Sequence, residues 1–320
     1  MSDLVTIQPP NGQPVKELVV ISGKGGTGKT SIVASFAALA QGAVLADCDV
    51  DAADLHLVVD PHILRREPFA GGKRARILPD QCAACGQCKE VCRFDAVFLD
   101  GPGNDVVQKT FRIDPLACEG CGVCASLCPM EAIEFGPVLN GEWFISETRF
   151  GPMVHAKLGI AAENSGKLVS TVRTNARRIA EERGFALALI DGSPGIGCPV
   201  IASITGAHLV LVITEPTLSS LHDLERVAAL TRHFGIPTLV CVNKWDINPQ
   251  ICEQIEDWVR DRGLVLAGRV RYDPAVTEAQ IHGKTVIEYQ QDGCAADIRS
   301  VWANVEARLE ISACALRNGV

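Results

Sequence analysis

The sequence contains no long apolar run and few aromatic residues, which make up 5% of its 320 positions. No stretch approaches the roughly 20 consecutive apolar residues that a membrane-spanning helix requires. The first residues, MSDLVTIQPPNGQPV, have neither a basic start nor an apolar core, and so do not resemble a signal peptide. These absences predict a cytoplasmic protein that does not associate with a membrane.

Positive charge is also scarce, because 38 acidic residues outnumber 30 lysines and arginines and give a net charge of −8. An acidic surface repels phosphate backbones, so we expect no nucleic-acid partner. The hydrophobic fraction is 47% and consists mainly of Ala, Val, Leu and Ile. This composition suits a parallel sheet that is buried on both faces.

Short apolar runs alternate with helical patterns along most of the chain. The first run, ELVVIS at 17–22, is followed by a helical pattern at 29–40 and a second run at 43–47, which together predict a βαβ unit. Further strands are predicted at 142–146, 185–190, 208–213, 238–242 and 265–270, with helices at 162–183 and 218–234 and two more at the end. The predicted fold class is α/β, with a doubly wound, mostly parallel sheet.

One segment, 69–137, interrupts this alternation. It carries Gly, Pro, charged residues and clustered cysteines, with only short apolar runs. We expect an inserted small α+β module, which would divide a discontinuous P-loop domain formed by 1–68 and 138–320.

Residues 23–30 read GKGGTGKT and match the phosphate-loop pattern G-x-x-x-x-G-K-T between a strand and a helix. Glycines let backbone N–H groups turn toward phosphates at a helix N-terminus. Lys29 is expected to reach the β- and γ-phosphates, and the Thr30 hydroxyl to bind Mg²⁺. An unliganded glycine-rich turn is the alternative, but motif and context both favour a nucleotide. The predicted nucleotide-binding residues are Gly23, Lys24, Gly25, Gly26, Thr27, Gly28, Lys29, Thr30, Ser31 and, at a later strand end, Asn243.

Three polar motifs follow other predicted strands: DCDVD at 47–51, DGSPG at 191–195 and NKWD at 243–246. Ligands of such sheets bind at the carboxyl ends of the strands. An acidic residue at a strand end is often only a helix cap, so each motif is weak alone and strong together with the phosphate loop. NKWD also matches the guanine-reading pattern N-K-x-D, so Asp246 leaves both ATP and GTP open.

The chain has 14 cysteines, which indicate metal binding or redox chemistry because no signal peptide precedes them. Two copies of C-x2-C-x2-C-x3-C lie between 82 and 128. This is the bacterial two-cluster ferredoxin pattern, in which the fourth cysteine of each copy ligates the other cluster. We expect a first 4Fe-4S cluster on Cys82, Cys85, Cys88 and Cys128, and a second on Cys118, Cys121, Cys124 and Cys92.

Zinc is the alternative metal, but zinc sites usually pair two C-x2-C knuckles and do not need this grouping twice. The clusters could also be purely structural, because so small a module has little core of its own. The first copy ends in Arg93 where ferredoxins commonly have Pro, which removes no ligand. Outside the two copies, Cys48, Cys241, Cys252, Cys294 and Cys314 are expected to be small buried residues.

The chain resembles the MinD-superfamily ATPases with an inserted ferredoxin domain, which are related to the Mrp-type carriers and the nitrogenase iron protein. The resemblance is carried by KGGTGKT at 24–30, by the doubled cysteine pattern, and by the stretches at 146–159, 191–203 and 214–227. It implies that Lys24 contacts nucleotide bound by a partner subunit, so that the active species is a nucleotide-dependent homodimer. It further implies that Asp49 orients the attacking water, Asp191 holds the Mg²⁺ shell and Asn243 contacts adenine, which favours ATP.

Three residues fall outside these assignments. Cys198 stands seven residues after Asp191, the offset at which the nitrogenase iron protein has a cluster-bridging cysteine. The partner cysteine of that protein has no evident match, so a buried structural thiol is favoured. His155 and Lys157 follow an apparent turn, and nucleotide sensing, partner contact and an ordinary surface position all remain open.

Three functions fit these features. The first is an Mg²⁺-dependent ATPase that couples a dimer cycle to electron transfer toward an unidentified redox or iron-sulfur client. The second is an assembly factor that delivers clusters, and the third is a MinD-like positioning ATPase with structural or redox-sensing clusters. Eight ferredoxin-type cysteine ligands indicate clusters that stay bound to the protein, which favours electron transfer. The lack of a basic amphipathic anchor disfavours the positioning role.

Overall fold

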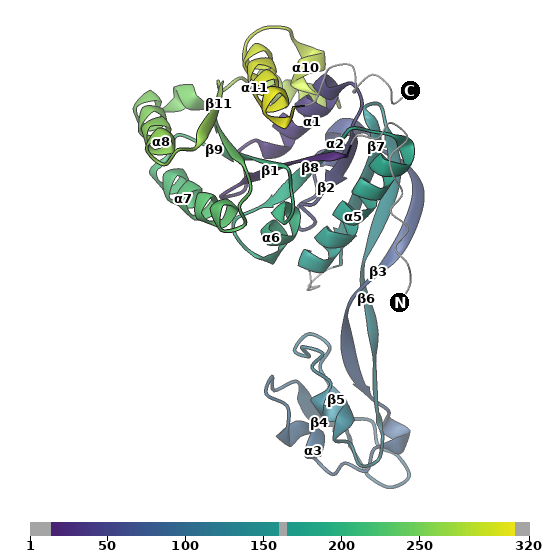
Figure 1. The fold of residues 1–320 in the computed structure, drawn as a ribbon. Helices are drawn as coiled ribbons and strands as arrows, with labels where there is room; N and C mark the ends of the chain where they lie inside the picture. The colour runs from purple at the N-terminus through teal and green to yellow at the C-terminus, as the bar shows by residue number, and fades with distance from the viewer. Residues whose placement is uncertain (1–13, 160–164, 311–320) are drawn as a thin grey trace. The chain divides into compact units, whose positions relative to one another are not determined.

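The computed structural model describes residues 14–159 and 165–310. These divide into two compact units, one formed by 14–67, 143–157 and 165–310, the other by 68–142 and 158–159 (Figure 1). The segment predicted as an insert, 69–137, lies within the second unit. The described residues do not include 1–13, the start of the helix predicted at 162–183, or Cys314.

Within the described residues, the main sheet has nine strands in the order β11-β10-β9-β1-β8-β2-β7-β6-β3. The pairs from β11 through to β7 are all parallel, which confirms the predicted α/β class. The strands of the first unit are β1 (Lys16–Ser22), β2 (Val44–Asp47), β7 (Gly151–Leu158), β8 (Leu187–Pro194), β9 (Leu209–Thr214), β10 (Thr238–Asn243) and β11 (Val265–Val270).

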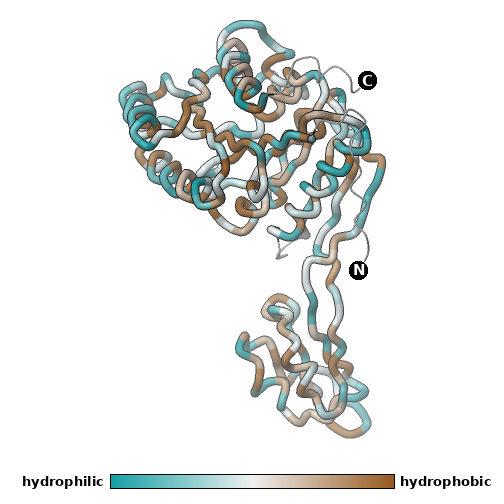
Figure 2. Tube along the Cα trace, viewed as in Figure 1, coloured by the Kyte–Doolittle hydropathy of each residue, from teal (hydrophilic) through white to brown (hydrophobic). Residues whose placement is uncertain are grey.

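Helices cover both faces of the parallel strands (Figure 1). Leu18 and Val20 point to the face that α1 and α11 cover, where Phe36 and Trp302 join the same apolar core. Figure 2 shows hydrophobic stretches along the central strands and mainly hydrophilic outer helices. Burial of these strands between the helices is favourable because it removes apolar surface from water. The helices are α1 (Lys29–Ala40), α2 (Leu55–Val59), α5 (Ser165–Arg183), α6 (Cys198–Ile204), α7 (Leu218–His233), α8 (Pro249–Asp261), α9 (Ala275–Ile281), α10 (Val286–Tyr289) and α11 (Cys294–Leu309).

Several elements differ from the prediction. The helix predicted at 29–40 is α1, and the strand at 265–270 is β11, but three helices follow β11 instead of two. The strand predicted at 142–146 is the end of a much longer strand, β6 (Ile133–Thr148), and β7 and α8 were not predicted. No helix of the described residues is long and apolar enough to cross a membrane.

The second unit is small and rich in short elements. It contains most of β3 (His62–Ile77) and part of β6, the antiparallel pair β4 (Val97–Gly101) and β5 (Thr110–Ile113), and the single-turn helices α3 (Gln87–Glu90) and α4 (Val123–Ser126). Its apolar core is formed by Ala75, Ile77, Ala96, Val97, Phe111, Ile113 and Ala132, with Cys82 and Cys88 buried among them. The core is therefore built directly around the cysteine motifs.

Candidate functional site

A pocket of about 580 Å³ lies at the carboxyl ends of the central strands, where ligands of such sheets bind. Its walls come from the phosphate loop, from the segment after β2 with α2, and from α9. The lining residues are Ser22, Gly25, Gly26, Thr27, Gly28, Lys29, Thr30, Ser31, Asp49, Ala52, Asp54, Leu57, Val58, Pro194, Thr277, Gln280 and Ile281. Of the predicted nucleotide-binding residues, Gly25 through Ser31 therefore share one cavity with Asp49, while Gly23, Lys24 and Asn243 do not line it.

The phosphate loop has a backbone that only glycine accommodates easily. Gly28 precedes α1 with a φ of +83°, and a Cβ there would lie 2.4 Å from Asn243 Nδ2. Asn243 Nδ2 donates to the carbonyl of Thr27 at 2.7 Å, so a residue at the end of β10 fixes the loop. Lys29, Thr30 and Ser31, which form the first turn of α1, line the pocket. The backbone N–H groups of a first helical turn are the donors that an anion site requires.

Three carboxylates surround the ammonium of Lys29. Its Nζ donates to Asp191 Oδ1 and lies 3.3 Å from Asp49 Oδ2. Burial alone would lower the pKa of Lys29, but attraction by Asp191 and Asp49 outweighs burial and raises it. Burial raises the pKa of Asp49 despite the nearby ammonium, and burial together with Asp191 raises the pKa of Asp47 well above its usual value.

The carboxylate of Asp47 organises the chain after β2. Its Oδ1 accepts from the N–H of Asp49, and its Oδ2 from the N–H of Leu55, each at 3.2 Å. Asp49 is thereby turned toward the pocket on a loop that a buried side chain supports. The sequence did not assign a role to Asp47, although it begins the DCDVD motif.

Two buried oxygens beside the loop have no hydrogen-bond partner within the described residues, Asp191 Oδ2 and Thr27 Oγ1. An unpaired buried carboxylate oxygen costs about 1–3 kcal/mol or more. Carboxylate and hydroxyl oxygens are also the ligands that Mg²⁺ prefers. The residues present therefore fit an Mg²⁺ ion, which Asp191 and Thr30 would hold.

A second cavity, of about 200 Å³, shares Gly28, Ser31 and Thr277 with the first. Asn243 and Lys244 line it from one side and Tyr272 and Asp273 from another. Asp246 is not among its lining residues, and its Oδ1 accepts from the N–H of Tyr272 at 2.7 Å. This cavity therefore includes Asn243, the residue predicted to contact the nucleotide base, but not Asp246.

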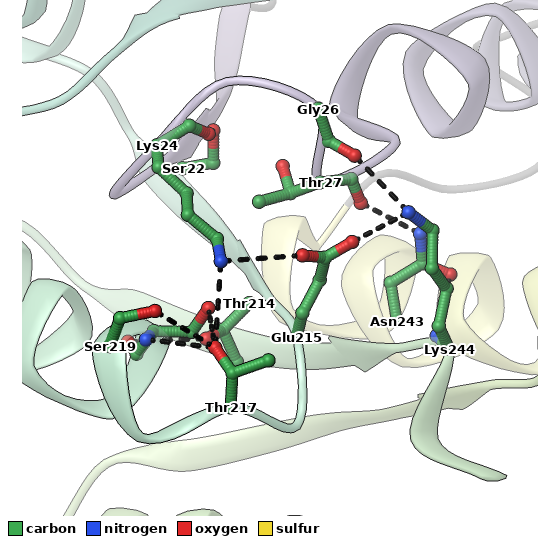
Figure 3. A network of polar contacts seen from close by, with 11 residues as sticks. Ser22, Lys24, Gly26, Thr27, Thr214, Glu215, Thr217, Ser219, Asn243 and Lys244 are labelled. Carbon is green, nitrogen blue, oxygen red and sulfur yellow. Dashed lines mark hydrogen bonds and ion pairs between the residues drawn. The ribbon is translucent and has the colours of Figure 1, made fainter. Parts of the chain in front are cut away.

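Lys24 does not line the pocket, and its side chain points toward Glu215 and Thr217 of its own chain (Figure 3). Its Nζ lies 3.6 Å from Glu215 Oε2 and 3.5 Å from Thr217 Oγ1. Lys244 Nζ contacts the other oxygen of the same carboxylate at 2.6 Å. The sequence predicted neither Glu215 nor Lys244 as a site residue, although Glu215 lies in the stretch 214–227 and Lys244 in the NKWD motif at 243–246.

The eight clustered cysteines surround two separate cavities in the second unit. Cys82, Cys85, Cys88 and Cys128 line the first, and Cys92, Cys118, Cys121 and Cys124 line the second. Each cavity thus combines three cysteines of one motif with the fourth of the other, which is the grouping that the ferredoxin pattern requires.

The two cysteine motifs have matching backbones. Ala84 and Gly120 both have positive φ, at 52° and 65°, and so do Asp95 and Glu131, both at 51°. A Cβ on Gly120 would lie 2.0 Å from the carbonyl oxygen of Lys73, so this position requires glycine. The sequence duplication is therefore also a structural one.

Four cysteines line each of the two cavities, and four is the number of ligands that a 4Fe-4S cluster takes. No group of three or more His, Cys, Asp or Glu side chains in the described part of the chain is arranged to hold one metal ion. A cubane binds its four cysteines at separate corners, so it needs a cavity between them rather than a common centre. Burial raises the pKa of Cys88 to about 11, and a bound metal would be needed to keep such a thiol deprotonated.

The remaining predicted residues are dispersed. Cys48, Cys241, Cys252 and Cys294 are buried, as expected.

Cys198 is exposed at the start of α6, so the expectation of a buried thiol was wrong: this helix buries Val200 in its first turn and leaves Cys198 on the solvent side. His155 is not a surface residue either. It lies buried in β7, 2.9 Å from Ser146 Oγ and stacked on Phe144, whereas Lys157 is exposed.

Comparisons with known proteins agree with this geometry. The family described as the CobQ/CobB/MinD/ParA nucleotide binding domain matches residues 18–286. An uncharacterized protein of Methanocaldococcus jannaschii is 34% identical over 244 residues, which are 73% of this chain and 80% of that protein.

Two solved structures share the fold. The septum site-determining protein MinD of Pyrococcus horikoshii, complexed with Mg-ADP, has a TM-score of 0.54 at 16% identity, over 91% of this chain and 96% of that chain. The ATP complex of a McdA variant from Cyanothece has a TM-score of 0.55 at 15% identity, over 94% and 98%. Because the family match at 18–286 covers most of this chain, the chain belongs to the CobQ/CobB/MinD/ParA nucleotide-binding domain family.

Proposed function

We propose that this protein is an Mg²⁺-dependent ATPase whose nucleotide-driven homodimer cycle is coupled to electron transfer through two 4Fe-4S clusters. The observation that carries the proposal is the presence, in one chain, of a phosphate-loop pocket and of two cavities that are each lined by four cysteines. The client that would exchange electrons is a separate redox protein.

ATP is the nucleotide that the second cavity fits better. A guanine-reading aspartate needs both carboxylate oxygens for the base, but Asp246 Oδ1 already accepts from Tyr272. Asn243 lines the cavity, and we propose that its amide, which bonds to Thr27 and Lys244 in this structure, turns to adenine when nucleotide binds. Structures of similar fold have been solved with Mg-ADP and with ATP, which supports the same choice.

Five residues in and around the pocket have distinct parts in the proposed hydrolysis. Lys29 stabilises charge on the transferring phosphoryl group, and Asp49, which faces Lys29 in the pocket, orients the attacking water. Asp191 and Thr30 would hold Mg²⁺, which neutralises phosphate charge when bound. Lys24 supplies a further positive charge to the nucleotide of the partner subunit.

The cysteine cavities would hold one cubane each, and a bound cubane stores and passes one electron. Buried backbone and apolar side chains around Cys82 and Cys88 exclude water from part of the first cavity. Because a cluster potential depends on such exposure, any dimer closure that covers the second unit would change it.

Cluster delivery is the second candidate, and one observation favours it. Each cavity has one exposed cysteine, Cys85 in the first and Cys121 in the second. An exposed ligand is a point at which a client thiolate could enter. A MinD-like positioning role is the third candidate and has the fold likeness in its favour.

Anaerobic isolation of the full chain tests the proposal. We expect about eight iron atoms per chain, slow ATP hydrolysis and a dimer in light scattering with a non-hydrolysable ATP analogue. Capture of partners with that analogue, followed by transfer assays, separates the candidates. Electrons that reach the client while iron remains on the chain support the first, whereas iron that moves to the client supports delivery. A chain that binds no iron would refute both.

A further inference from the structure

The charged residues that follow three neighbouring strands meet beside the phosphate loop. In the sheet, β9 lies between β1 and β10. Lys24 follows the end of β1, Glu215 follows β9 directly and Lys244 follows β10 directly. The topology therefore places one carboxylate between two ammonium groups, as Figure 3 shows.

Each oxygen of Glu215 faces a different lysine. Oε1 is 2.6 Å from Lys244 Nζ, and Oε2 is 3.6 Å from Lys24 Nζ. The side chain of Glu215 is only 15% exposed, whereas those of Lys24 and Lys244 are 36% and 28% exposed. A carboxylate this buried is unfavourable without a cation, so at least one lysine must remain beside it.

The two lysines are not held equally. Lys244 Nζ also donates to the carbonyl of Gly26 at 3.2 Å, so it is tied to the phosphate loop as well as to Glu215. Lys24 has the longer contact with Glu215 and a second one, of 3.5 Å, to Thr217 Oγ1. Ser22 Oγ donates to the carbonyl of Lys24 at 2.7 Å and fixes its backbone, so its side chain is the part free to move.

We propose that Glu215 holds Lys24 within its own subunit when the chain is alone, and that Lys244 keeps Glu215 paired when Lys24 swings out to a partner's nucleotide. This inference rests on the dimer cycle proposed above and adds the residues that regulate it. Glu215 opposes release of Lys24, and Lys244 makes release possible without leaving a carboxylate unpaired.

The hold on Lys24 is tested in the nucleotide-free full chain. Lysine acylation is followed by mass spectrometry, with the exposed Lys109 as the reference in the same sample. A held ammonium reacts slowly, and a partly exposed ion pair holds it only weakly, so Glu215→Gln should raise the acylation rate of Lys24 about threefold. An unchanged Lys24 rate in Glu215→Gln would overturn the proposal.

The release step is tested by dimer affinity at a saturating concentration of a non-hydrolysable ATP analogue. Glu215→Gln should dimerise more tightly than the wild type, because Lys24 is already free. Lys244→Met should dimerise more weakly, because release of Lys24 then leaves Glu215 without a cation. The double variant has no carboxylate to leave unpaired, so it should recover the affinity lost in Lys244→Met.

The signs of these effects distinguish the proposal from a structural role. If Glu215→Gln and Lys244→Met both weaken the dimer and the double variant is weaker still, the network only supports the fold and the proposal is wrong. If Lys24 labelling rises in Glu215→Gln but no variant dimerises with nucleotide, the hold stands and the dimer cycle of the proposed function is what fails.

Discussion

Lys29 and Asp191 are hydrogen-bonded in the buried part of the site although 162 positions separate them in the chain. The contact joins the phosphate loop to Asp191 within β8, the strand that lies between β1 and β2. The cation that is expected to reach the phosphates therefore already lies beside the carboxylate expected to hold Mg²⁺. Nucleotide binding would have to redistribute these contacts rather than create the site.

Replacing Lys29 tests the phosphate loop. Lys29→Ala should lower the rate of ATP hydrolysis at least about a hundredfold, because it removes the charge that stabilises the transferring phosphoryl group. The exposed Lys109→Ala is the matched control and should hydrolyse ATP like the wild type. Steady-state phosphate release measures both, and undiminished release from Lys29→Ala would contradict the assignment.

The crossed grouping of cysteines is tested by pairs of substitutions. Cys128→Ala should reduce iron from about eight to about four atoms per chain, because one cubane loses a ligand. Adding Cys82→Ala should remove no more iron, since both residues line the same cavity. Adding Cys118→Ala instead should remove nearly all of it, and the opposite result would assign Cys128 to the other cluster.

The duplicated turns offer a matched pair of variants. Gly120→Ala places a Cβ 2.0 Å from the carbonyl oxygen of Lys73 at a φ of +65°, so the loop carrying Cys118 and Cys121 must shift. We expect loss of about half of the iron. Ala84→Gly changes the equivalent position of the first motif, where glycine fits readily, and should keep all of it. Equal iron contents in the two variants would show that the close contact is unimportant.

The buried histidine predicts a dependence of stability on pH. Burial, with a smaller effect of His56, lowers the pKa of His155 from 6.5 to about 4. Below pH 6.5 the unfolded chain therefore takes up this proton before the folded chain does. The contribution of neutral His155 to the free energy of unfolding is therefore fully present above pH 6.5 and is lost as the pH drops toward 4. The loss between pH 7 and pH 5 is about 2 kcal/mol.

Urea unfolding at both pH values measures this effect. His155→Gln should lose that part of the pH dependence. Ser146→Ala keeps the histidine and should keep the dependence, while losing about 1 kcal/mol at every pH through the missing hydrogen bond. Identical pH dependence in the wild type and His155→Gln would refute the prediction.

Nucleotide and redox states are expected to be linked. If ATP changes the surroundings of the clusters, reduction must change ATP affinity by the same factor. A tenfold change corresponds to about 1.4 kcal/mol, or roughly 60 mV for one electron. Redox titrations followed by EPR, with and without nucleotide, measure the shift. Unchanged potentials together with equal ATP affinities would eliminate this coupling and move delivery or a structural role ahead.

The βαβ start and the cysteine groupings could be predicted because their signals are local. A glycine loop between an apolar strand and a helix fixes α1 at 29–40, and the spacing of cysteines fixes which of them share a cavity.

Strand β3 could not be predicted in the same way. Its first six residues, His62–Glu67, are mostly exposed and mix apolar with charged side chains, and buried residues alternate with others only from Phe69 onward. A period of two is therefore hidden in the sequence. Strand β7 was missed for the opposite reason, because buried residues occupy consecutive positions from Pro152 to Ala156 and produce no alternation.

The contacts of Glu215 with two lysines depend on strand order. Lys24, Glu215 and Lys244 are far apart in the sequence, and only the arrangement β10-β9-β1 brings their strand ends together. Neither the phosphate loop nor NKWD contains that information. The same reasoning applies to Asp191, in β8, and Lys29, which begins the helix after β1, because β1 and β8 become neighbours only in the finished sheet.

The position of the cysteine module in the chain sets an order for biosynthesis. Residue 128, the last cysteine of either cavity, leaves the ribosome before β8 begins at Leu187. Because β8 separates β1 from β2 in the sheet, the nucleotide domain cannot close until well after both cavities have their full complement of thiols. The thiols of both cavities are therefore all synthesised before the strands of the ATP site can assemble, and a chain truncated between the two events would carry the eight cysteines without an ATP site.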